Sequence, residues 1–421
     1  MPPTDSSLVI RSLDELPDLE RALETYHRVD SAAFGDPPDP RHRAARRLMV
    51  DPSRWFLAEL DGEPCGGVGS LATELALPGG ASVPVGGVSD VGVLPTHRRR
   101  GVLSALLDRQ LGDLARRGEV AAVLHASEAG IYRRFGFGPA VRWRHITMEA
   151  RRAAYREDWP QPGGSYRMVP REEAHESCAA VHERARRVGH GSLARSDAWW
   201  QVVLGDVDLY LGGGERRMVV QHLDDSGVPD GYAIYEVAQD WSSGQAHHTL
   251  EVWELVGTTA AVELGLWRTL LDHDLVHTVR GPVTVDHALW DVVVDTRQVR
   301  TVWDQDLLWA RLLDVPAALS ARTYGVADEL TIEVRQERGD DVAGTYRLCS
   351  DVEGGPATCE RTHGAAELSV DLADLGACWL GSWSFRRLVR AGRVVEGSEG
   401  AAARADRMFG TDPLPWCWVR F

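Results

Sequence analysis

The sequence contains no lysine, because all 46 of its basic residues are arginines. A GC-rich genome, whose codon bias favours arginine, is the simplest explanation. An arginine stays protonated in proteins, whereas a Schiff-base or general-base lysine must lose its proton to react. The absence therefore excludes every mechanism that needs a lysine nucleophile from this chain.

Cysteine pairs and long apolar runs are also missing. The six cysteines include no CxxC pair, so we interpret them as reduced, buried thiols in a chain of 421 residues that can build its core without disulfides. No stretch approaches about 18 consecutive apolar residues, the length of a membrane span. Residues 1–18 lack the basic and apolar regions of a signal peptide. We therefore expect no membrane span and a cytoplasmic location.

Positive charge is scarce relative to negative charge. The 62 acidic residues outnumber the 46 basic ones, which gives a net charge of −16. Nucleic-acid binding depends on clustered basic charge, so nucleic acid is not expected as the main partner. The 44% hydrophobic and 26% charged residues are ordinary for a globular protein, and the length is typical of two or three domains.

Hydrophobic periodicity predicts an α+β first domain over residues 1–150. Apolar runs predict strands at residues 8–10, 55–60, 66–72, 83–93, 120–125 and 141–148. Helical spacing of apolar residues predicts helices at residues 13–30, 101–114 and 131–135. The charged and Pro/Gly-rich stretch 151–164 is typical of a linker. We therefore expect a second domain over residues 151–296 and a third over residues 297–421.

A weak internal repeat relates the first two expected domains. Leu106-Leu107-Asp108 recurs as Leu270-Leu271-Asp272, and the same spacing places Gly265 on Gly101. Three consecutive arginines, Arg98 to Arg100, become Val262, Glu263 and Leu264 in the second copy. The repeat predicts a second copy of one strand–loop–helix unit that has lost its positive charge.

The third segment, residues 297–421, differs in composition from the rest. It is rich in tryptophan and ends on the apolar and aromatic run Pro413-Leu414-Pro415-Trp416-Cys417-Trp418-Val419-Arg420-Phe421. Chain ends are usually polar and frayed. This end is therefore predicted to dock into the protein.

The most informative stretch runs from Gly87 to Ser104, where an apolar strand leads through a basic loop into a helix. A helix start exposes unpaired N–H groups and the positive end of the helix dipole. The arginines add charge, and Gly101 would let the backbone approach a pyrophosphate closely. Neither the GxxxxGK[ST] nor the GxGxxG phosphate-binding pattern is present. By itself the stretch fits a phosphate cradle and a solvated arginine run equally well.

Two motifs add a family resemblance. Arg98-x-x-Gly101-x-Leu103 after a strand resembles the pyrophosphate motif of the GNAT N-acetyltransferases, with Leu103 where a small residue is usual. Ser127-Glu128-Ala129-Gly130-Ile131-Tyr132 resembles a later motif of that superfamily. With Arg311-Leu312-Leu313-Asp314-Val315-Pro316-Ala317-Ala318 and the terminal Phe421, the whole chain resembles the Eis-type N-acetyltransferases of actinobacteria.

The resemblance implies an architecture and a set of partners. It implies two tandem GNAT-like domains, the second degenerate, and a third α+β domain resembling sterol carrier protein. It also implies acetyl-CoA as the acyl donor, a small-molecule amine as the acceptor, and a homohexamer. Aminoglycosides, acetylated at more than one amine, and protein lysines are the implied acceptors.

The same resemblance implies a role for individual residues. Tyr132 is the implied acid that protonates the departing thiolate, and the α-carboxylate of Phe421 is the implied base. Ser127 and Glu128 would line the cofactor near the thioester. The remaining cofactor-binding residues would hold the pantetheine arm (Val91, Gly92 and Val93) and the pyrophosphate (Arg98, Arg99, Arg100, Gly101, Val102, Leu103 and Ser104). Candidates for a pocket that accepts a polyamine are Glu24, Asp30, Phe34 and Asp36, whereas Arg420 would add positive charge beside the base.

Each of these roles has a simpler alternative. Tyr132 could pack in the core with its hydroxyl on a backbone carbonyl, and the carboxylate of Phe421 could be solvated and inert. The whole chain could be an inactive acyltransferase scaffold, or a lipid carrier that acts through its third domain.

Two further patterns are better explained by a structural role than by a catalytic or metal-binding one. His273-Asp274-Leu275-Val276-His277 places two imidazoles at helical spacing, but without the glutamate of the HExxH signature or a third ligand, so no metal is expected. Gly212-Gly213-Gly214 lies between apolar runs and predicts a hairpin turn.

Overall fold

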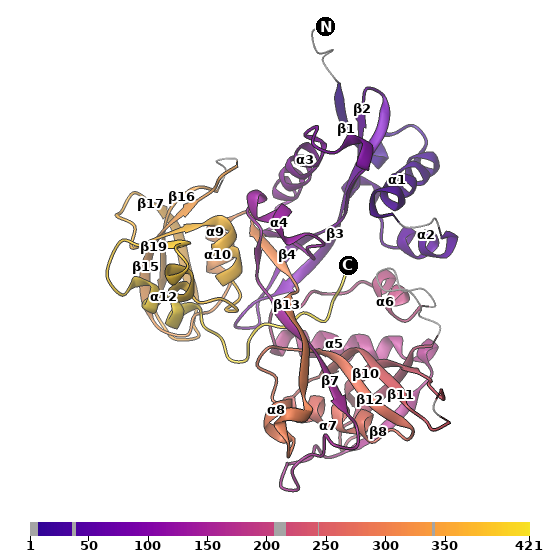
Figure 1. Ribbon diagram of the computed structural model, residues 1–421. Coiled ribbons are helices and arrows are strands. Elements are labelled where there is room, and N and C mark those ends of the chain that lie inside the picture. The colour runs from indigo at the N-terminus through magenta and orange to yellow at the C-terminus, as the bar shows by residue number, and fades with distance from the viewer. Residues whose placement is uncertain (1–6, 36–38, 206–215, 243, 339–341) are drawn as a thin grey trace.

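Three mixed sheets form the framework of the protein. The computed structural model describes residues 7–35, 39–205, 216–242, 244–338 and 342–421. Each sheet carries its own helices, and the C-terminus lies between the regions of the first and second sheets (Figure 1). Within the described ranges, no helix has the length and apolar character that crossing a bilayer requires.

The first sheet contains one parallel pair of strands, β4 and β5, among antiparallel ones. Its strands are, in spatial order, β1 (Leu8–Ser12), β2 (Phe56–Leu60), β3 (Glu63–Ala76), β4 (Ser82–Val93), β5 (Ala121–Leu124), β14 (Trp309–Leu312) and β6 (Gly138–Pro139). Its helices are α1 (Leu19–Phe34), α2 (Pro40–Arg47), α3 (Val102–Arg116) and α4 (Ala129–Tyr132).

Alternation along the strands separates two apolar faces of this sheet. Val85 and Val123 lie in the cluster that includes the buried side of α1, whereas Ala122 and Leu124 lie in the cluster beneath α3. The two helices therefore cover opposite faces of the sheet. None of the residues of α2 is buried.

The second sheet repeats this arrangement. Its strands are, in spatial order, β13 (Arg300–Asp306), β7 (Arg142–Glu149), β12 (Val276–Val283), β11 (His248–Gly257), β10 (Pro229–Ala238), β9 (Met218–Leu223) and β8 (Ser165–Val169). Its helices are α5 (His175–Val188), α6 (Asp197–Val203), α7 (Ala260–Leu271) and α8 (Leu289–Val292). β11 and β12 pair in parallel, as β4 and β5 do in the first sheet.

Two strands are exchanged between these sheets. β7 precedes the second expected domain but joins the second sheet between β13 and β12. β14 follows that domain but returns to the first sheet between β5 and β6. The boundaries expected at 150/151 and 296/297 therefore follow chain order, whereas the sheets share strands across them.

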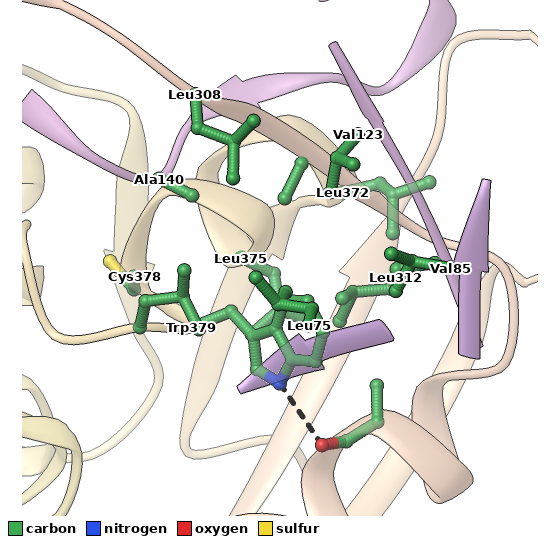
Figure 2. Close-up of a cluster of buried hydrophobic side chains, with 14 of the residues drawn as sticks. Leu75, Val85, Val123, Ala140, Leu308, Leu312, Leu372, Leu375, Cys378 and Trp379 are labelled. Carbon is green, nitrogen blue, oxygen red and sulfur yellow. Dashed lines mark hydrogen bonds between the residues drawn. The ribbon is translucent and has the colours of Figure 1, made fainter. Parts of the chain in front are cut away.

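The region of the third sheet packs against the first sheet through one of its helices. Its strands are, in spatial order, β17 (Ala357–Thr362), β16 (Gly344–Ser350), β15 (Asp328–Arg335), β18 (Leu368–Asp371) and β19 (Val394–Glu396). Its helices are α9 (Val315–Ser320), α10 (Leu372–Cys378), α11 (Phe385–Arg390) and α12 (Ala401–Phe409). Figure 2 shows Leu372 and Leu375 of α10 among Val85, Val123 and Leu312 of the first sheet, so one core spans both regions.

The sequence predicted most elements of the first region. The expected strands and helices correspond to β1 to β5, β7, α1, α3 and α4, although a 3₁₀ turn occupies Leu13–Glu15 before α1. The helical placement of His273 and His277 was wrong, because α7 ends at Leu271 and His277 lies in β12. The three glycines at 212–214 lie outside the described residues.

Candidate active site

The parallel strands at the centre of the first sheet separate at one end. β4 pairs with β5 only from Val85 to Gly87, and a bulge follows at Asp90, whose φ of 55° is left-handed. Beyond Gly87, the described part of the chain supplies no strand on that edge of β4. The sheet is therefore open between its two central strands.

The open edge presents backbone groups from two of the predicted residues. Leu94 donates its N–H to the carbonyl oxygen of Cys65, at 2.8 Å, so this residue turns towards β3. Because successive residues of a strand point their N–H and C=O groups to opposite sides, Val93 and Val91 turn theirs towards the opening. An extended molecule could add there as a strand does.

The loop after β4 leads to an uncapped helix start. Arg99 has a φ of 62° and Gly101, the N-cap of α3, has a φ of 82°. In the described structure no side chain caps the first amides of α3, and a Cβ added at Gly101 would meet no atom within 4 Å. The N–H groups of Val102, Leu103 and Ser104 therefore begin the helix beside open space, where an anion is favoured.

The arginines of this loop surround that space with exposed charge. The guanidinium of Arg98 lies 4.0 Å from the carboxylate of Glu128, and that of Arg100 lies 3.4 Å from Asp61. These contacts are solvent-exposed and therefore weak, so the guanidinium groups can turn to a phosphate at small cost. An open helix start beside exposed arginines favours an anion such as a pyrophosphate, and among the described residues no cluster could hold a metal ion.

Tyr132 lies at the end of α4, on the α3 side of the sheet. Its ring is buried in the α3 cluster and meets Phe137 edge to face at 6.2 Å. Burial raises the pKa of its phenol, an effect that a hydrogen bond with Ser127 opposes and the charge of Glu128 adds to. The hydroxyl is therefore protonated at neutral pH and can donate a proton.

Phe421 lies on the opposite side of the sheet, and the predicted docking of the chain end is confirmed. Its side chain is only 6% exposed and belongs to the α1 cluster. Its ring covers Gly87, where an added Cβ would lie 3.1 Å from Cε2. Tyr132 and Phe421 thus lie on opposite faces of the first sheet.

His125, which directly follows β5 of the first sheet, contacts the chain end. Its ring meets Phe421 edge to face at 4.8 Å, and Nε2 lies 3.1 Å from the carbonyl oxygen of Val419. Nδ1 lies 2.8 Å from the carbonyl oxygen of Leu307. Burial lowers the pKa of His125 to about 4, so at neutral pH the ring is uncharged and one of its nitrogens donates.

The second sheet region anchors the rest of the tail. Arg195 forms a buried ion pair with Glu254 of β11, at 2.8 Å, and donates to the carbonyl oxygen of Trp418, at 3.3 Å. The backbone N–H of Trp416 donates to the carbonyl of His190, at 3.0 Å. The second sheet region therefore holds the tail, whose last residue packs against the first sheet.

Two carboxylates and one arginine lie further along β4, on the face that Phe421 covers. Arg46 of α2 contacts Asp30 of α1 at 2.8 Å and Asp90 of the bulge at 2.6 Å. Phe34 lies beside them, 3.5 Å from a Cβ added at Gly92. Of the four residues predicted for an acceptor pocket, Asp30 and Phe34 meet here. Glu24 is exposed on α1, and Asp36 lies outside the described residues.

Sequence reasoning missed Arg46, Asp90 and His125 as members of this site. Asp90 stands inside the strand that the motif identified, so its proximity could have been inferred. Arg46 belongs to a helix with no buried residue and a strongly polar sequence, which gives no signal of its own. Arg420, expected beside the base, places its guanidinium 4.8 Å from the ring centre of Trp143.

The second region lacks the counterpart of the cradle. Only Thr258 and Thr259 separate β11 from α7, and the hydroxyl of Thr259 accepts from the N–H of Val262, at 3.3 Å. The alignment of Gly265 with Gly101 was therefore wrong beyond the strand, because a shorter loop shifts the helix. Gly265 lies inside α7, where an added Cβ would meet the hydroxyl of Tyr166 at 2.3 Å.

Comparison with known proteins identifies all three regions. Residues 19–140 and 191–312 each match a family described as acetyltransferase (GNAT) domain, and residues 315–418 match the sterol carrier protein domain. An uncharacterized N-acetyltransferase of Streptomyces avermitilis is 35% identical over 96% of this chain and 98% of its own length. N-acetyltransferase Eis of Mycobacterium tuberculosis is 33% identical over 91% of this chain and 93% of its own. The crystal structure of Eis1 from Mycobacterium abscessus is 34% identical, covers 98% of this chain and 100% of that one, and has a TM-score of 0.84.

Proposed function

Because this chain belongs to the Eis-type N-acetyltransferases, we propose that it transfers the acetyl group of acetyl-CoA to small-molecule amines, aminoglycosides among them. The observation that carries the proposal is the opening between β4 and β5. The open start of α3 follows β4, and Tyr132 and Phe421 lie on opposite faces of the same sheet.

The chain's own groups can supply the two proton transfers. Acetyl-CoA supplies a thioester, which an amine attacks only after losing a proton. The α-carboxylate of Phe421 accepts that proton, and Tyr132 donates one to the sulfur of the departing thiol. Burial keeps the phenol protonated for this task, because it raises the pKa of Tyr132.

The acceptor class follows from charge on the α1 face of β4. The carboxylates of Asp30 and Asp90 lie near the chain end along one face and suit a molecule with several ammonium groups. Aminoglycosides fit this description, and so does the lysine side chain of a protein. Arg46 already contacts both carboxylates, so a polycation must compete with it.

Location and assembly complete the proposal. The six free cysteines fit a reducing cytoplasm, and family resemblance adds a homohexamer. Light scattering of the purified protein measures that assembly directly.

The decisive experiment is an assay of CoA release with a panel of amines, with products identified by mass. We expect turnover with at least one polyamine, which an inactive scaffold or a pure lipid carrier would not give. Tyr132→Phe should lower turnover by about 100- to 10,000-fold and leave acetyl-CoA affinity unchanged.

A C-terminal extension tests the base without changing a side chain. It converts the α-carboxylate of Phe421 into an amide and should abolish turnover, whereas an N-terminal extension should be harmless. A C-terminally extended protein that is folded, binds acetyl-CoA and reacts at the normal rate would contradict the assignment.

A further inference from the structure

We propose that Asp374 in the third domain is a positioning residue for Tyr132, which it holds through Arg133. This inference rests on the proposed function, because it assigns Tyr132 as the proton donor. The third domain would then contribute to the reaction in two ways. It supplies the chain end, and it orients Tyr132 through this contact.

The contact is a two-pronged ion pair across a domain boundary, in which the carboxylate is buried and the side chain of Arg133 is 41% exposed. Asp374 of α10 is 0% exposed. Nη1 and Nη2 of Arg133 donate to its two carboxylate oxygens at 2.9 and 2.7 Å. Arg393 donates to the same carboxylate. A fork of this kind fixes orientation as well as distance, and Arg133 follows Tyr132 directly in the chain.

The helix that carries Asp374 is seated on the first sheet by backbone contacts. A Cβ at Gly138 of β6 would lie 1.7 Å from the carbonyl oxygen of Ala373, and one at Gly376 would lie 2.3 Å from that of Ala310 of β14. Both glycines are required for this approach. Figure 2 shows the neighbouring Leu372 and Leu375 within the shared core, so α10 cannot shift without disturbing it.

The ring of Tyr132 is buried and its carbonyl oxygen accepts from the N–H of Phe137, at 3.3 Å, but the segment that precedes it has little to hold it. α4 spans only Ala129–Tyr132, no described side chain caps it, and the residues from Ser127 to Gly130 are exposed. A single helical turn has almost no stability of its own. The tether at Arg133 therefore sets the direction in which the phenol enters the site.

The test replaces Arg133, because Asp374 then keeps Arg393 and no buried charge is left unpaired. Arg133→Met should lower kcat by about 10- to 100-fold, since a displacement of about 1 Å at a reacting group can cost that much. Its acetyl-CoA affinity, measured by calorimetry, should stay unchanged, and Arg133→Lys should recover part of the loss. Asp108→Asn is the matched control, because it removes a solvent-exposed ion pair, with Arg338, between the same two domains.

The sharper readout is the effect of Arg133→Met in the Tyr132→Phe background. If Arg133 acts through the phenol, the second change should add nothing once the hydroxyl is gone. Equal losses in both backgrounds, or no loss in either, would overturn the inference. Normal turnover by Tyr132→Phe alone would overturn the proposed acid as well, so the two failures are distinguishable. Should Arg133→Met not fold, Arg133→Lys carries the same comparison.

Discussion

The first and second regions each connect a parallel pair of strands through a helix, but the loops that lead into the two helices differ. The first places residues 94–101 between β4 and α3, with three arginines and an uncapped helix start. The second has two threonines there, and one of them caps α7. The two regions thus differ in the length of this loop and in the cap of the helix, whereas both keep the parallel pair.

The second region also carries an acid in the first turn of its helix, whereas the arginines of the first region precede α3. Glu263 lies in the first turn of α7, and its carboxylate lies 3.7 Å from the ring of His287. Burial raises the pKa of Glu263 to about 8 and lowers that of His287 to about 4. A carboxyl group in the first turn of α7 makes this helix start less favourable for a phosphate than that of α3.

The largest expected effect concerns the two helix starts. Gly101→Asp should abolish measurable acetyl-CoA binding, because it adds a negative charge at the cradle and a side chain at a left-handed φ. Thr259→Asp should leave binding unchanged, since aspartate is itself a good cap. Calorimetry of both variants checks the comparison, and Gly101→Ala separates backbone strain from charge. Equal loss in both variants would mean that the second region binds the cofactor too.

The next prediction concerns the way in which the second region anchors the chain end. Arg195→Met leaves Glu254 buried without its ion-pair partner, which should cost about 3–5 kcal/mol of folding free energy. It also removes the donor to the carbonyl of Trp418, so kcat should fall while acetyl-CoA affinity persists. Urea unfolding and steady-state kinetics measure the two effects. The control is Arg187→Met, which breaks an exposed ion pair with Glu183 in the same region. An Arg195→Met enzyme with full kcat would show that the tail needs no such anchor.

A smaller effect is expected at the carboxylates of the first region. Arg46→Gln frees Asp30 and Asp90 from a positive charge, so the KM for a linear triamine should fall about tenfold, equivalent to about 1.4 kcal/mol. The KM for a monoamine should change less, and added salt should reduce the difference. Arg47→Gln removes another ion pair of α2, with Glu20, and serves as control. Identical KM ratios in both variants would show that these carboxylates do not meet the acceptor.

The smallest effect is a pH dependence in the second region. The folded pKa of Glu263, about 8, lies above its unfolded value, so the folded state binds the extra proton and stability falls as pH rises through 8. Between pH 7 and 9 the loss should be about 1 kcal/mol, and Glu263→Gln should remove it. Urea unfolding at both pH values provides the measurement. An equal loss of stability in the wild type and in Glu263→Gln would show that another group causes the pH dependence.

Much of the first region could be predicted from the sequence because its signals are local. The turn at Asp61-Gly62 and the leucine stripe of α3 each fix an element within a short window. The loop with Arg98 to Gly101 likewise lies within one window, and its motif identified the cradle. The exchange of β7 and β14 could not be predicted, since strand partners are set by packing over distances of more than 150 residues in the chain.

The second copy shows where a pattern misleads. The spacing that aligned β11 with β4 failed at α7, because a deletion in a loop leaves no trace in the apolar residues that flank it. The pairs Asp374–Arg133 and Arg46–Asp90 were equally invisible, since each joins a common charged residue to another far along the chain. Charge partners of this kind become apparent only in three dimensions.

The exchanged strand β14 has a consequence for how the protein is made. The ribosome releases the chain from its N-terminus, and domains generally begin to fold as they emerge. The first sheet cannot be completed before β14, residues 309–312, has been synthesised, and β14 emerges only after the whole second region. Until then β5 exposes an unpaired edge, which is a hazard for aggregation. That edge therefore needs protection while residues 125–308 are synthesised.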